Sequence, residues 1–307
     1  MRGDMFEKQD KIPPTEEKNT VFGSEETGCK INLHLRVTGC RPDGYHTLAT
    51  CFLPLATPSD RITVGENAGA EGIEFRSDCA AIPCDDRNLA VAAAKRYADA
   101  AGITPRWRIT LEKRLPIAAG VGGGSADAGA VLRILEAHCR LLGRNRLAEV
   151  ALSLGADVPF FLDPTRAAFA RGIGEELHPL TSSPLPVVLA APGFPVSAKW
   201  CYRHLDPAAI GPEEPGIEEK LAAALAAGDV RRVAALVRND LEAALYRKFP
   251  QLELIRETML EAGALAAAVS GSGPTLFALA ADDAGRTAVA EALRRRFAGD
   301  EIMRIFC

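Results

Sequence analysis

The residues best suited to chemistry form a glycine-rich run, Gly120 to Ser125, with glycine at four of its first five positions and a hydroxyl at its end. Glycine lets a backbone adopt positive φ and approach a ligand closely, so that successive amide groups can point into one concavity. Apolar residues recur three, four and seven positions after Ala128, which predicts a helix that begins near Ser125. Because a helix N-terminus attracts negative charge, we interpret the run as a phosphate-binding loop.

Two common glycine loops do not match this run. A Walker A loop ends in Gly-Lys-Ser or Gly-Lys-Thr, whereas here Gly124 directly precedes Ser125. A dinucleotide-binding fingerprint that starts at Gly120 needs its third glycine where Ser125 stands. A flexible hinge without a ligand is the remaining alternative. The strand pattern before the run and the helix pattern after it favour phosphate binding over a hinge.

One lysine and one aspartate elsewhere in the chain could also take part in a reaction, because each stands in an otherwise apolar or alternating segment. Apolar and polar residues alternate from Ile31 to Thr38, which predicts a half-buried strand with Lys30 and Asn32 on one face. The acid is Asp157, inside the otherwise apolar run from Gly155 to Phe161. Taken singly, such a lysine is most often a solvent-exposed charge, and such an aspartate most often caps a turn or a helix.

The segments around these residues predict an α/β layer followed by an α+β unit. In the first half, Asp85 or Asp86 is available to cap a helix. The predicted elements there are Arg61 to Gly65, Gly72 to Arg76, Asn88 to Ala101, Trp107 to Lys113 and Asn145 to Leu154. In the second half they are Val187 to Ala191, a helix carrying Trp200 to Tyr202, helical segments at Ile217 to Leu245 and Leu252 to Ala262, Ala264 to Val269, Thr275 to Ala280, Asp283 to Arg296 and Glu301 to Phe306.

Composition divides the chain into a tail and two domains. Residues 1–28 are polar and show no sustained periodicity, which predicts a disordered tail or a misplaced start site. Three prolines interrupt the pattern between Glu175 and Pro186. We therefore expect an ATP-binding domain at 29–178 and a second domain at 179–307.

The totals exclude several classes of protein. A chain of 307 residues with 48% hydrophobic content can bury a large core, and a net charge of −4 offers no basic surface for nucleic acid. No apolar run approaches the length of a membrane span, and the N-terminus lacks a signal-peptide layout, so we expect a cytoplasmic protein. The eight cysteines include no Cys-x-x-Cys pair, which favours reduced thiols over disulfides or zinc.

Several motifs together resemble those of the GHMP kinases. Pro116 to Ala128 is similar to the second motif of that family, Ser270 to Pro274 to the third, and Gly155 to Pro159 to the segment that bears the catalytic aspartate. Lys30 to Leu48, with Gly44-Tyr45-His46, resembles one branch in particular, whose members phosphorylate a polyol linked to cytidine diphosphate. The resemblance implies a two-domain α+β fold, with an N-terminal domain like the second domain of ribosomal protein S5 and a ferredoxin-like C-terminal domain.

The same resemblance implies an activity and roles for residues. It implies phosphorylation of the 2-hydroxyl of CDP-methylerythritol in non-mevalonate isoprenoid synthesis, with ATP and Mg²⁺ as cofactors. Lys30 would supply a catalytic cation and Asp157 the acceptor of the alcohol proton. Ser125 would also meet a magnesium ion. The implied substrate-binding residues are Asn32, Tyr45, His46 and Tyr202. The implied nucleotide-binding residues are Asn88, Lys113, Pro116, Ile117, Ala118, Ala119, Gly120, Val121, Gly122, Gly123, Gly124, Ser125 and Ala126.

Some residues depart from the family pattern, and other functions remain open. Ala198 stands where a hydroxyl is expected before Tyr202, and Gly129 replaces a frequent alanine. One rival function is another small-molecule kinase of the family, for homoserine or mevalonate. A second rival is a non-catalytic nucleotide sensor, against which the retention of both Lys30 and Asp157 counts. A monomer and a homodimer are both compatible with the sequence.

Overall fold

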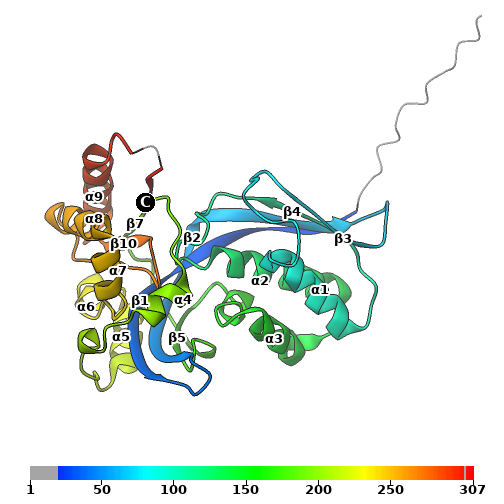
Figure 1. The fold of residues 1–307 in the computed structure, drawn as a ribbon, viewed down its shortest axis with the longest axis horizontal. Coiled ribbons are helices and arrows are strands. Elements are labelled where there is room, and N and C mark those ends of the chain that lie inside the picture. Colours follow the sequence, from blue (N-terminus) through cyan, green and yellow to red (C-terminus); the bar gives the residue numbers. More distant parts are fainter. Residues whose placement is uncertain (1–19, 301) are drawn as a thin grey trace, which may run out of the picture.

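A long antiparallel hairpin runs through the molecule and connects its two halves (Figure 1). The computed structural model of the chain describes residues 20–300 and 302–307. Strand β1 (Val21–Cys40) pairs with β2 (His46–Glu66) over nearly their whole length. The predicted tail was therefore wrong for Val21 to Gly28, which belong to β1. Of the rest of that prediction, residues 1–19 lie outside the described residues.

The hairpin forms because one face of β1 is apolar. Ile31, Leu33 and Leu35 are each at most 1% exposed, as the alternation predicted. The residues of β1 before Gly28 are mostly polar and partly exposed, so the same alternation is absent from them. Their pairing with β2, and not their own pattern, makes them a strand.

A seven-stranded sheet is built on this hairpin. Its strand order is β3-β4-β2-β1-β8, and β5 pairs with β2 and β6 with β5. The sequence predicted β3 (Gly72–Ser77) and β4 (Arg106–Glu112). It missed β5 (Ala167–Arg171) and β6 (Glu176–Leu180), and it assigned β8 (Arg238–Asn239) to a helical segment, which was wrong. The predicted boundary between residues 178 and 179 falls inside β6, and the division into domains stays a prediction.

Three helices cover one face of this sheet (Figure 1). They are α1 (Leu89–Ala101), α2 (Gly123–Cys139) and α3 (Gly143–Leu154), followed by the 3₁₀ turn η1 (Pro159–Leu162). The cap of α1 is Asn88 and neither Asp85 nor Asp86, because Asn88 Oδ1 accepts a hydrogen bond from the backbone N–H of Ala90 at 2.9 Å. The predicted helix is thus correct and its predicted cap was wrong.

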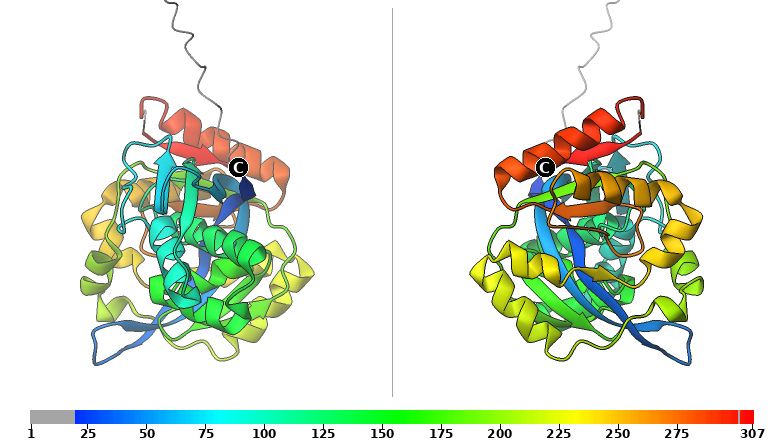
Figure 2. Two further views of the ribbon diagram at one scale, coloured as in Figure 1. Left: turned by 90° about the vertical axis from the view of Figure 1, so that its right-hand side faces the viewer. Right: turned by 90° about the vertical axis from the view of Figure 1, so that its left-hand side faces the viewer.

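A second sheet of four strands, ordered β11-β7-β10-β9, forms the other half. Figure 2 shows helix α9 beside β11 at one end of the molecule. This half agrees with the predicted α+β unit. Its strands are β7 (Val187–Ala191), β9 (Ala266–Val269), β10 (Leu276–Leu279) and β11 (Arg304–Phe306). Its helices are α4 (Ala198–Arg203), η2 (Pro207–Ala209), α5 (Ile217–Ala227), α6 (Val230–Ala235), α7 (Glu242–Lys248), α8 (Pro250–Glu261) and α9 (Asp283–Arg296).

Candidate active site

A cavity of about 860 Å³ lies where the glycine loop, the tip of the β1–β2 hairpin and helix α4 meet. Residues from both halves of the chain line it, which is typical of ligand sites. Nine residues that the sequence singled out are among them: Lys30, Asn32, Tyr45, His46, Gly120, Gly122, Ser125, Asp157 and Tyr202.

The two predicted catalytic groups contact each other in this cavity. Lys30 Nζ lies 3.3 Å from Asp157 Oδ2 and donates a hydrogen bond to Asn32 Oδ1 at 2.8 Å. It also lies 4.6 Å from the ring centroid of Phe52. An ammonium group has three N–H donors, so these two polar partners leave one for a ligand. Lys30 is only 4% exposed, so little water screens its positive charge and its attraction for an anion is strengthened.

Asp157 is more accessible than its partner. It follows α3 in a turn and its side chain is 36% exposed, against 5% for the side chain of Lys30. One carboxylate oxygen contacts the ammonium group, and the other can accept a proton from a bound alcohol. Both polar atoms of the Asn32 side chain already have partners within the protein. Its Nδ2 donates to Thr50 Oγ1 at 2.8 Å, and its Oδ1 accepts from Lys30. The Asn32 side chain therefore orients Lys30.

Close backbone contacts hold the glycine loop against β1. The amide of Lys30 donates to the carbonyl oxygen of Val121 at 2.9 Å. Gly122 has φ of +73°, and a Cβ there would lie 2.9 Å from the ring of Phe161. Gly120 has φ of +78°, and a Cβ there would lie 2.4 Å from the carbonyl oxygen of Ser270. Larger residues fit neither position. The helix after the loop begins at Gly123, two residues before the predicted start.

The second glycine turn, Ser270 to Pro274, packs beside this loop. Ser270 Oγ donates to the carbonyl oxygen of Gly120 at 3.0 Å, and it accepts a hydrogen bond from the amide of Asn32 at 3.3 Å. The amide of Thr275 donates to the carbonyl oxygen of Ala119 at 3.1 Å. Three segments far apart in the sequence thus fix the loop.

Only part of the predicted nucleotide-binding loop faces the cavity. Gly120, Gly122 and Ser125 line it, whereas Ala119, Val121 and Ala126 are at most 5% exposed and belong to the core. The structure also does not bring Asn88 to the cavity, because its side chain caps α1 and donates to the carbonyl oxygen of Pro83. The other predicted loop residues that do not line it are Pro116, Ile117, Ala118, Gly123 and Gly124.

Lys113 lies in a buried charge cluster, not in the cavity lining. Its Nζ donates to Asp60 Oδ2 at 2.5 Å and to Asp127 Oδ2 at 2.9 Å, and its side chain is 5% exposed. Thr27 Oγ1 donates to Asp127 Oδ1 at 3.0 Å. Asp60 Oδ1 accepts the backbone amides of 114 and 115. Since Asp127 belongs to α2, this cluster ties the segment that enters the glycine loop to the helix that leaves it.

Burial governs the ionisation of this cluster. Burial raises the pKa of Asp127 to about 6, although Lys113 acts in the opposite direction. Burial alone would lower the pKa of Lys113, but the carboxylates of Asp127 and Asp60 outweigh it and raise that pKa. The lysine therefore stays charged and paired.

Aromatic rings of His46, Tyr45 and Tyr202 form one side of the cavity. The rings of His46 and Tyr202 stack at 5.4 Å with an interplanar angle of 22°. Tyr45, at the hairpin tip, is 61% exposed. Burial raises the pKa of Tyr202, so its hydroxyl stays protonated near neutral pH.

Sequence reasoning missed several residues of the site. Lys199 and Arg203 line the cavity from α4, beside Tyr202. Their spacing around Tyr202 was the available signal, because residues three and four apart share one face of a helix. Asp60 and Asp127 were also missed as a pair, and no local pattern connects residues 67 positions apart.

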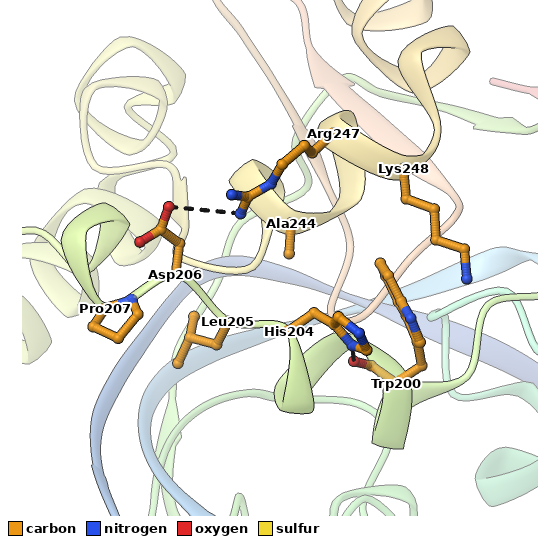
Figure 3. Close-up of a pocket in the computed structure, with 8 residues that line it drawn as sticks. All are labelled: Trp200, His204, Leu205, Asp206, Pro207, Ala244, Arg247 and Lys248. Carbon is orange, nitrogen blue, oxygen red and sulfur yellow. Dashed lines mark hydrogen bonds and ion pairs between the residues drawn. The ribbon is translucent and has the colours of Figure 1, made fainter.

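Trp200 of α4 and His204, which follows it, line another cavity of about 510 Å³, together with Arg247 and Lys248 of α7 (Figure 3). There, the ring of Trp200 stacks on that of His204 at 4.6 Å, and Lys248 Nζ lies 4.0 Å from the centroid of the indole. Arg247 and Asp206 form an ion pair at 3.6 Å across this cavity. These contacts connect α4 to α7.

The described residues fit a magnesium ion that is bound mostly by phosphates. Between residues 20 and 300, and in 302–307, no three His, Cys, Asp or Glu side chains are grouped to hold a metal. Mg²⁺ usually keeps several waters and takes one or two protein ligands plus substrate phosphates. Ser125, in the first turn of α2 and on the cavity wall, and Asp157 are oxygen ligands of the required kind. None of the described helices has the length and apolarity of a membrane span.

Family comparisons match both halves of the chain. The model for the GHMP kinases N terminal domain matches residues 88–163, and the model for GHMP kinases C terminal matches residues 221–299. A 4-diphosphocytidyl-2-C-methyl-D-erythritol kinase of Chlorobium phaeobacteroides is 39% identical over 252 residues, which are 81% of this chain and 86% of the relative. One of Prosthecochloris aestuarii is 37% identical over 86% of this chain and 91% of the relative.

Solved structures give the same result. A crystal structure of 4-(cytidine 5'-diphospho)-2C-methyl-D-erythritol kinase matches with a TM-score of 0.76 and 38% identity, over 92% of this chain and 97% of that one. L. major mevalonate kinase in complex with R-mevalonate matches with a TM-score of 0.68 at 17% identity, over 94% and 96% of the two chains. At that identity the second likeness concerns the fold alone. The predicted two-domain α+β fold is confirmed.

Proposed function

The chain belongs to the GHMP kinase family, among the 4-diphosphocytidyl-2-C-methyl-D-erythritol kinases, and from this membership we propose how its residues phosphorylate the 2-hydroxyl of 4-diphosphocytidyl-2-C-methyl-D-erythritol. It is an ATP-dependent kinase of the non-mevalonate route to isoprenoid precursors. The observation that carries the assignment of roles is the contact of Lys30 with Asp157 in the cavity beside the glycine loop.

The glycine loop and the start of α2 hold the phosphates of ATP. Phosphoryl transfer passes through a loose transition state, so the protein chiefly aligns two oxygens and neutralises charge. Backbone amides near Gly120 and Gly122 and the dipole of α2 supply partial positive charge, and Lys30 supplies a full one. Ser125 would help to hold a magnesium ion bound with ATP, and that ion would neutralise further charge on the phosphates.

Asp157 accepts the proton of the substrate alcohol. The bond from the γ-phosphorus to the bridging oxygen of ATP breaks, the bond to the substrate oxygen forms, the alcohol proton passes to Asp157, and ADP leaves. In a loose transition state most of the proton transfer follows P–O cleavage, so a carboxylate is a sufficient proton acceptor. The neighbouring ammonium group of Lys30, 3.3 Å from Asp157 Oδ2, orients the carboxylate.

The aromatic side of the cavity binds the cytidine part of the substrate. Tyr202, stacked on His46, and the exposed Tyr45 offer flat faces to a pyrimidine. Stacking on an aromatic ring contributes about 1 to 3 kcal/mol per base. Ala198 lacks the hydroxyl expected at its position, so its side chain offers no hydrogen bond to the substrate. We expect the protein to act as a monomer or a homodimer.

The decisive experiment follows ADP release with ATP, Mg²⁺ and a panel of acceptors. The panel contains 4-diphosphocytidyl-2-C-methyl-D-erythritol, the same polyol without its cytidine diphosphate, mevalonate and homoserine. We expect ADP release with the cytidylylated polyol alone. Release with mevalonate or homoserine instead would assign another substrate of the family. ATP binding without release for any acceptor would favour a sensor.

A further inference from the structure

The proposed function leaves the diphosphate bridge of the substrate without a binding partner. A diphosphate esterified at both ends carries a negative charge on each phosphorus, and burying such charges without counter-charges is costly. Lys30, the cation nearest the chemistry, is already paired with Asp157. The bridge lies between the cytosine and the reacting alcohol, so its counter-charges must lie between the aromatic side of the cavity and Asp157.

Two cations line the cavity and form no ion pair with any described acidic side chain. They are Lys199 and Arg203, both exposed residues of α4. Each of the two acids that line the same cavity already has a basic partner: Asp157 pairs with Lys30 at 3.3 Å, and Asp43 pairs with Arg41 at 2.8 Å. The charge of the α4 wall is therefore uncompensated.

The helix places these cations beside the proposed base-binding ring. Lys199 and Arg203 are one helical turn apart, and Tyr202 lies between them on the same side of α4. Another side of α4 is anchored by Trp200, which lies beside Lys248 (Figure 3). The ring of Trp200 also contacts that of Phe249, with centroids 5.9 Å apart. These contacts fix the rotation of α4 about its own axis, so that Lys199 and Arg203 face the cavity.

We propose that Lys199 and Arg203 bind the diphosphate of the substrate, and that this subsite makes the enzyme select a nucleoside diphosphate-linked alcohol over a free nucleoside or a free polyol. This assignment deepens the proposed function and rests on it. The guanidinium group of Arg203 forms paired hydrogen bonds to phosphate oxygens, and Lys199 supplies a second point charge. Because the diphosphate is remote from the reacting atoms, the two residues determine substrate specificity and take no part in the chemical step.

Binding of CDP and of cytidine tests the subsite directly. The probes are titrated calorimetrically against the whole protein, with saturating Mg²⁺ and adenylyl imidodiphosphate to block the ATP side. We expect the unaltered protein to bind CDP more tightly than cytidine. Lys199→Met and Arg203→Met should each weaken CDP binding about tenfold, in line with the strength of charge-assisted hydrogen bonds, and leave cytidine binding unchanged. Added NaCl should weaken CDP binding to the unaltered protein more than to the double variant.

Controls separate this role from folding and from chemistry. Lys220→Met removes an exposed lysine that does not line the cavity and should change neither affinity. In turnover, the double variant should raise the KM for the cytidylylated substrate and keep kcat and the KM for ATP. Variants that weaken CDP binding and cytidine binding equally, or that change neither affinity, would overturn the proposal. If the ratio shifts as expected but no acceptor yields ADP, the proposed function fails and the diphosphate subsite stands.

Discussion

The glycine-loop side and the α4 side of the cavity differ in how much of their charge is already compensated. On the loop side, Lys113 is buried between Asp60 and Asp127, and Lys30 between Asn32 and Asp157. On the α4 side, Lys199 and Arg203 are exposed and unpaired with any described acid. The first region is organised before ligand binds, whereas the second gains its counter-charge from the ligand.

The difference follows from what each region must do. Stabilising a transferring phosphoryl group requires fixed dipoles and charges that do not reorganise during the reaction. A large acceptor substrate has to enter and leave, so its side of the cavity stays open to water. Substitutions on the loop side should therefore affect folding or turnover, and those on the α4 side should affect substrate binding alone.

The largest effect is expected where the two regions meet, at Asp157. Asp157→Asn preserves the shape of the side chain but removes the proton acceptor and the charge beside Lys30. We expect kcat to fall by about two orders of magnitude or more, with ATP affinity nearly unchanged. Steady-state kinetics and ATP titration measure the two quantities. Retained turnover would refute the role of Asp157.

Removal of Lys113 tests whether the loop side depends on its buried charges. Lys113→Met leaves Asp60 and Asp127 facing each other without a cation, and we expect the free energy of unfolding to fall by about 3 kcal/mol. Urea unfolding measures the change. Lys95→Met is the matched control, because Lys95 forms its ion pair with Asp86 on the surface, where such pairs contribute about 0 to 1 kcal/mol. Equal losses in the two variants would contradict the contrast between the regions.

The aromatic wall should give a smaller effect that is confined to the substrate. Tyr202→Ala removes the ring stacked on His46, and loss of about 1 to 3 kcal/mol of stacking should raise the KM for the cytidylylated substrate several-fold or more. The KM for ATP should not change. Tyr202→Phe keeps the ring and serves as the control, with a KM close to that of the unaltered enzyme. Parallel increases in both KM values would count against a cytosine contact.

The smallest effect is expected from the titration of Asp127. Because burial raises its pKa from 3.8 to about 6, the folded chain binds this proton more tightly than the unfolded chain does. The stabilisation is complete below the unfolded pKa and is lost as the pH rises through 6. Between about pH 4 and 6, the free energy of unfolding of the unaltered protein should therefore fall by on the order of 1 kcal/mol relative to Asp127→Asn. Urea unfolding across this pH window measures the difference, and parallel curves for the two proteins would exclude it.

Local pattern was enough for many of the elements. The predicted strand Val187 to Ala191 and the predicted helix Asp283 to Arg296 match β7 and α9 residue for residue. The strand is a short continuous apolar run, and the helix has apolar residues at helical spacing. Strand β8 has neither pattern. It consists of two residues that become a strand by pairing with His34 and Leu35 of β1, inside a segment whose alanine content favours a helix.

The sequence by itself indicated which groups this protein has for phosphoryl transfer. The glycine loop at the start of a helix follows from residue type and short spacing, whereas Lys30, Asp157 and the Tyr45-His46 pair follow from the resemblance of their motifs to those of the GHMP kinases. The tertiary structure alone decided which of them meet. It brought Lys30 to Asp157 across more than a hundred residues, paired Lys113 with Asp60 and Asp127 in a buried cluster, and placed Lys199 and Arg203 in the cavity lining. Such contacts depend on strand pairing and burial between distant segments, which no local pattern encodes.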